Sequence, residues 1–132
     1  MRVKGFSLIE LLVVIGVIAL INVIMLPNYA SMISAAKALS AKSTTRNLMV
    51  ALEQYYFMHQ TYPQGTNQRI VTVLNELMDK DIINAIPINP FTGHAYHYSD
   101  DSGQIYYTLM AADAYQIQLM GEGNKQVVFQ YP

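Results

Sequence analysis

A carboxylate stands inside the most apolar part of this sequence. Glu10 lies four positions after Phe6 in an otherwise uncharged run that ends at Leu26, and the next charged residue is Lys37. An ionised carboxylate is costly in lipid, less so near the interface, and a buried charge that lacks a partner is costly anywhere. The position therefore predicts either a cationic partner for Glu10 or a side chain that reaches the membrane interface.

Three histidines and two neighbouring aspartates are the remaining residues that could bind a metal ion. His94 and His97 are three apart in an expected strand or turn, where they would point to opposite faces, and no helical His-Glu pairing accompanies His59. We interpret all three as surface residues and predict no zinc site. Asp100 and Asp101 offer oxygens to calcium, although a hairpin turn explains the same residues better.

Composition narrows the classes of function. The chain has 132 residues, a formal net charge of −1 and no cysteine, so neither a nucleic-acid surface nor a thiolate site is expected. Ten tyrosines favour core and sheet packing with a polar tip over an electron-transfer role. No catalytic triad, phosphate loop or carboxylate pair is present, so we predict that the chain is not an enzyme.

The apolar run must be positioned by a helix. Phe6 to Leu26 would span about 30 Å, roughly the hydrocarbon thickness of a bilayer, and the preceding Arg2 and Lys4 predict a cytoplasmic N-terminus. A cleaved secretory signal would have a shorter core, and a plain membrane anchor would leave Glu10 without a partner. A helix that packs against other copies would supply one.

The helix is expected to continue beyond Pro27, because apolar residues then recur at spacings of three and four as far as His59. Gly16 and Pro27 are expected to be weak points where the helix kinks. From Phe6 to His59 the rod would be about 80 Å long, more than a small domain can bury. Its N-terminal half must therefore lie in lipid or against other copies.

The rest of the chain predicts a small α+β head. A short helix is expected over 70–81 and a loop over 82–90. Four strands joined by tight turns are expected in an antiparallel meander, at 95–99, 104–110, 114–120 and 126–131. Along 114–120 the apolar residues Tyr115, Ile117 and Leu119 alternate, so one face should pack on the amphipathic half of the long helix.

The segment from Gly5 to Glu10, with the apolar run behind it, resembles the class III signal of type IV pilins and type II secretion pseudopilins. The resemblance implies that a prepilin peptidase cuts after Gly5 and that the new N-terminal Phe6 is N-methylated. Glu10 then corresponds to the glutamate at the fifth mature position, whose carboxylate meets the amino group of a neighbouring subunit. It also implies that the stretch between Gly16 and Pro27 unwinds in filaments.

A second resemblance lies in the head. The stretch Asn89–Tyr96 is similar to an Asp-Pro-Trp-Gly-Asn-Pro-Tyr segment of the major secretion pseudopilins, which have a calcium loop nearby. This chain has Asn in place of the Asp and Phe in place of the Trp, and most of the Gly- and Asp-rich tail is missing. Calcium at Asp100 and Asp101 is thus the less favoured expectation, and no other cofactor is expected.

Together these features predict a pilin-like α+β protein in four segments: a leader at 1–5, a transmembrane and assembly helix at 6–27, the amphipathic half of that helix at 28–59, and a head at 60–132.

The predicted function is a structural subunit of a type IV pilus-like filament. A pseudopilin of a secretion or DNA-uptake system and a monomeric membrane-anchored binding protein are the alternatives. The expected partners are other copies, the prepilin peptidase and an inner-membrane assembly platform. The expected locations are the inner membrane, then a periplasmic or surface filament.

Overall fold

The computed structural model describes residues 5–132, except for the side chains of residues 25–28. The expected leader residues Arg2 and Lys4 lie outside the described residues. The chain divides into two compact units, one ending at Ala35 and the other running from Ala36 to Pro132. Helix α1 (Leu8–His59) contributes to both units, and its C-terminal bound is the one predicted from the sequence.

The first unit is an apolar helical segment. Each large apolar side chain from Phe6 to Ile24 is exposed, with exposed fractions between 46% and 82%. The helix assignment continues through Gly16 and through the backbone of Pro27. No single helix in the described residues has the length and hydropathy of a membrane span, but Leu8–Ile24 and Tyr29–His59 satisfy both together as a bent pair.

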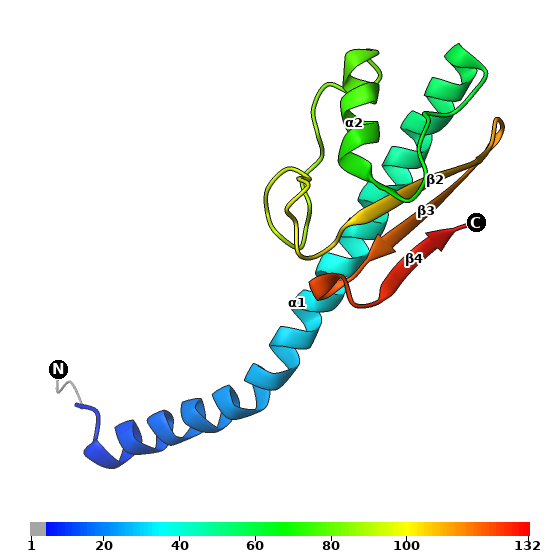
Figure 1. Ribbon diagram of the computed structural model, residues 1–132. Coiled ribbons are helices and arrows are strands. Elements are labelled where there is room, and N and C mark those ends of the chain that lie inside the picture. Colours follow the sequence, from blue (N-terminus) through cyan, green and yellow to red (C-terminus); the bar gives the residue numbers. More distant parts are fainter. Residues whose placement is uncertain (1–4) are drawn as a thin grey trace. The chain divides into compact units, whose positions relative to one another are not determined.

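The second unit is the head, which adds a short helix and a sheet to the C-terminal part of α1 (Figure 1). Its elements after α1 are β1 (Gln68–Arg69), α2 (Ile70–Asp79), β2 (Ile105–Ala111), β3 (Ala114–Met120), the 3-10 turn η1 (Glu122–Asn124) and β4 (Val127–Tyr131). The sheet is antiparallel in the order β1-β2-β3-β4. The predicted α+β fold is confirmed; β1 was missed because two residues carry no periodic signal.

The core of the head lies between α1, α2 and the sheet. Leu52 of α1, Leu74 of α2 and Ile117 of β3 have at most 1% of their surface exposed. The predicted alternation along β3 is confirmed, because Tyr115, Ile117 and Leu119 are buried while the residues between them are partly exposed. Burial of this apolar face stabilises the head and fixes the register of β3.

The strand predicted at 95–99 is wrong. Ala95 makes only an isolated bridge to Ile88, and the chain turns at residues 98–99. Buried side chains order this loop instead of a strand ladder. Asn89 Nδ2 donates to Asp100 Oδ2 and to the Ser102 carbonyl, each at 2.9 Å, and the Phe91 N–H donates to Asn89 Oδ1 at 3.0 Å. Within 95–99, the His97 N–H donates to Asp100 Oδ2 at 3.1 Å and the His97 carbonyl accepts from Gln104 Nε2 at 2.9 Å, so side chains satisfy these backbone groups in place of a neighbouring strand.

Candidate functional site

Ser7 and Glu10 form a reciprocal cap at the start of α1. The Ser7 N–H donates to Glu10 Oε2 at 2.8 Å, and the Glu10 N–H donates to Ser7 Oγ at 3.3 Å. Two backbone donors that the first helical turn leaves free are satisfied in this way. The sequence signal was present, since Ser-x-x-Glu before an apolar run is a capping box, but the sequence analysis did not assign that role to Glu10.

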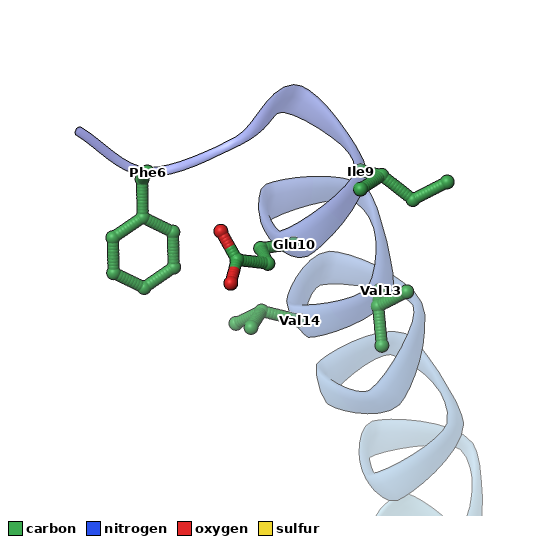
Figure 2. Close-up of a pocket in the computed structure, with 5 residues that line it drawn as sticks. All are labelled: Phe6, Ile9, Glu10, Val13 and Val14. Atoms are coloured by element: carbon green, nitrogen blue, oxygen red, sulfur yellow. The ribbon is translucent and has the colours of Figure 1, made fainter. Parts of the chain in front are cut away.

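The Glu10 carboxylate also lies beside the expected processing point. Figure 2 shows its side chain extending toward the Phe6 ring, with Val14 on the same side of the helix. An open pocket of about 370 Å³ is bordered by Phe6, Ile9, Glu10, Val13 and Val14, and Glu10 is the one charged residue among the described residues on its wall. Glu10 is exposed in the single chain, so a cationic nitrogen would bind its carboxylate strongly only where lipid or other helices cover this surface and exclude water.

Two glycines in this unit, Gly5 and Gly16, lie where the described residues leave room for a side chain. A Cβ atom added at Gly5 or at Gly16 would meet no atom within 4 Å, and neither residue has a positive φ. Gly5 and Phe6 are both exposed, so the peptide bond between them is open to solvent. Any requirement for glycine at these positions therefore comes from outside the folded chain.

The candidate calcium residues lie in different surroundings. Asp100 is buried; its Oδ2 accepts hydrogen bonds from Asn89 and from the His97 N–H, and its Oδ1 lies 3.6 Å from His94 Nδ1. Asp101 is exposed. Within the described residues, no three His, Cys, Asp or Glu side chains come together in a way that could hold a metal ion. Calcium at this loop stays an untested prediction.

The tyrosines of the head gather around two glutamates. Tyr62 Oη donates to both carboxylate oxygens of Glu53, at 2.9 and 3.0 Å, and Tyr55 Oη donates to Glu76 at 2.6 Å. Burial, followed by these hydrogen bonds, raises the pKa of Tyr55 and that of Tyr62 to about 12. The hydroxyls therefore stay protonated at neutral pH and remain donors.

The sequence around Phe6 and Glu10 matches a known family model, and a longer part of the chain matches known proteins. Residues 1–25 match the family model for the prokaryotic N-terminal methylation motif. Over 77 residues, which are 58% of this chain, it is 29% identical to the fimbrial protein of Neisseria meningitidis serogroup B and 26% identical to the type IV major pilin protein PilE1 of Neisseria gonorrhoeae. The chain is thus similar to type IV pilins over this segment. The resemblance read from the sequence is thus confirmed.

The similarity to these pilins is partial. The matched segment spans 45% of the meningococcal protein and 36% of the gonococcal one, so the chain spans less than half the length of either curated relative. No solved structure matches the chain significantly. The family model itself covers residues 1–25, which include the first turns of α1 and none of the sheet.

Proposed function

We propose that this chain is a structural, non-enzymatic subunit of a type IV pilus-like filament. A prepilin peptidase would cut the peptide bond between Gly5 and Phe6, Phe6 would be N-methylated, and α1 would polymerise with the helices of other copies. The precursor would lie in the inner membrane with a cytoplasmic N-terminus. An inner-membrane platform would then assemble it into a periplasmic or surface filament.

The observation that carries this proposal is the exposed apolar surface between Phe6 and Ile24, interrupted by one carboxylate. A surface of this size on a single chain indicates an environment of lipid or of other helices. Glu10 favours other helices over lipid as the final environment. After cleavage each helix would begin with a charged amino group, and this group could pair with the carboxylate of another copy. The open space around Gly16 fits the close approach of a neighbouring helix.

A pseudopilin of a secretion system is the second candidate. The stretch from Asn89 to Tyr96 resembles such proteins, and in this structure it forms a loop ordered by Asn89 and Asp100. The relatives that match are named as a fimbrial protein and a major pilin, which favours the pilus subunit.

Electron microscopy of sheared surface material from a deletion strain would separate these possibilities. If the chain is a pilus subunit, long filaments should be lost and should return when the gene is restored. Intact filaments with blocked protein secretion would support the pseudopilin. Intact filaments with normal secretion would contradict both.

A further inference from the structure

An amide side chain lies inside the apolar run of α1. Asn22 comes about 24 Å after Phe6 along the helix, and its neighbours Ile21 and Val23 are both apolar. The hydrocarbon layer of a bilayer is about 30 Å thick, so this side chain would lie within that layer in the proposed precursor. Polar side chains are costly at such a depth, and they usually face another helix or a water-filled cavity.

The chain itself satisfies only part of this amide. Asn22 Nδ2 donates one hydrogen to the Ile18 carbonyl at 2.7 Å, and that carbonyl is also the regular helical acceptor of the Asn22 backbone N–H. Among the described residues the Asn22 side chain makes no second hydrogen bond, so Oδ1 and the other amide hydrogen are left without a partner. In lipid each such group is unfavourable, because no water replaces the missing partner.

Asn22 belongs to an exposed stripe on one side of α1. The stripe consists of Leu11, Ile15, Ile18 and Asn22. These residues follow one another at spacings of four, three and four, which brings their side chains to the same side of a helix. At about 100° per residue, Glu10 is turned about 120° away from Asn22. The stripe is therefore a separate surface from the pocket that Glu10 borders.

A second copy of this chain fits the stripe. Apolar residues at these spacings form the seam between two helices, and a single Asn within such a seam fixes the register of the pair. An Asn side chain carries both donors and an acceptor, so the same residue on a parallel helix at the same depth supplies what Asn22 lacks. A lipid tail would satisfy neither group, and a charged partner would itself be costly at this depth.

We propose that the uncut precursor pairs in the membrane through Asn22, whose amide exchanges hydrogen bonds with Asn22 of a second copy. This inference rests on the proposed membrane-anchored precursor. The stretch between Gly16 and Pro27 is expected to unwind in filaments, so the pair belongs to the stage before assembly, while α1 is still helical here. Glu10 is not needed for this pairing, because its carboxylate caps its own helix in the uncut chain.

Energy transfer between labelled copies would measure this pairing. The chain has no cysteine, so Lys125→Cys at an exposed position of the head gives a single site for a dye. Uncut full-length chains with donor or acceptor dye would be mixed in vesicles of phosphatidylethanolamine and phosphatidylglycerol, and dilution with lipid would give the association constant. Asn22→Leu should weaken the association about threefold to thirtyfold, because it removes the hydrogen bonds between the two helices.

Two further variants assign the effect to the amide. Asn22→Gln keeps the donors and the acceptor on the same side of the helix, so it should retain most of the association. Val17→Leu is the matched control, because it introduces the same side chain about 140° away from Asn22, and it should leave the association unchanged. Leucine favours helices, so circular dichroism should show the same helix content in all variants.

Several outcomes would overturn the proposal: no energy transfer that depends on dilution, unchanged association of Asn22→Leu, or a loss as large in Asn22→Gln or Val17→Leu. Extraction of cell membranes with alkaline carbonate separates this failure from failure of the proposed function. If the chain stays in the membrane and Asn22→Leu associates normally, only the pairing is wrong. If alkali releases the chain, the membrane-anchored precursor is wrong and the pairing with it.

Discussion

The N–H of Ser7 donates to the Glu10 carboxylate at 2.8 Å, one peptide unit away from the nitrogen of Phe6. In the uncut chain the acid thus already caps its own helix. Cleavage after Gly5 would turn the Phe6 nitrogen into a charged amino group next to this cap. Glu10 would then have two possible partners, the start of its own helix and the amino group of another copy.

Processing is expected at one peptide bond. Mass spectrometry of filament material should show a chain that begins at Phe6 with a methyl group on its nitrogen, because the Gly5–Phe6 bond is exposed and belongs to the methylation motif. Peptides that retain Met1 in mature filaments would contradict the proposed cleavage. Replacing Gly5 by a larger residue should block it without unfolding the chain, since a Cβ there meets no atom within 4 Å.

Assembly should depend on the charge of Glu10. Glu10→Ala and Glu10→Val should still insert into the membrane, because both residues are apolar, but the yield of filaments should fall about tenfold or more, since the amino group of the neighbour loses its partner. Sheared filaments and membrane fractions would be compared by immunoblot. Ser7→Ala is the matched control: it removes one bond of the cap and keeps the charge, so filaments should persist. Normal assembly of Glu10→Val would remove the pairing role.

Chelation should have little effect on the head. Addition of EDTA to the full-length protein should hardly change its Tm, because Asp100 is held by Asn89 and the His97 N–H and Asp101 points to solvent. Thermal unfolding with EDTA, with and without excess calcium, measures this. A drop of many degrees that calcium reverses would establish the calcium site that the sequence left as the less favoured expectation.

The buried amide of Asn89 should be important for stability. Asn89 is fully buried, and Asn89→Ala would leave the Ser102 carbonyl without its side-chain donor and the Phe91 N–H without its acceptor. Asp100 Oδ2 would keep the bond from the His97 N–H and lose the one from Asn89. We expect a loss of about 2–3 kcal/mol in the free energy of unfolding, measured by chemical denaturation. Asn84→Ala is the control, because Asn84 is exposed and lies outside this network. Equal stability of the two variants would show that the loop does not depend on the amide.

Alkaline pH should destabilise the head. The pKa values of Tyr55 and Tyr62 are about 12 in the folded chain, against an ordinary value of 10.0. Below the ordinary value both hydroxyls are protonated in folded and unfolded chains, and their stabilisation is fully present. Between that value and about 12 the unfolded chain loses protons that the folded chain keeps, so stability falls as pH rises.

Tyr55 and Tyr62 account for part of this pH dependence, because burial also raises the pKa of Tyr96, Tyr107 and Tyr115. Chemical denaturation at increasing pH should give a free energy of unfolding that declines above about pH 10. The double variant Tyr55→Phe, Tyr62→Phe should decline less steeply, because it lacks these two titrating groups. An identical slope in the variant would place the alkaline transition elsewhere.

Several features of this chain can be predicted from its sequence alone. The cleavage motif from Gly5 to Glu10, the length of α1 and the buried face of β3 all depend on residues that are close in the sequence. Helical periodicity and strand alternation are local properties, so the spacing of side chains records them. The capping role of Glu10 also depends on neighbouring residues only, because Ser7 and Glu10 are three positions apart. The Ser-x-x-Glu pattern was sufficient to predict it.

Only the tertiary structure determines which residues that are far apart in the sequence contact one another. The segment expected as a strand at 95–99 is a loop, next to which Asn89 and Asp100, eleven positions apart, bond to each other in a buried site. The Tyr115 hydroxyl and the Glu53 carboxylate, 62 positions apart, come within hydrogen-bond distance only in the folded head. Propensity and periodicity describe neighbours along the chain, whereas partners that satisfy a buried polar group are chosen by packing, and packing is set by the whole fold.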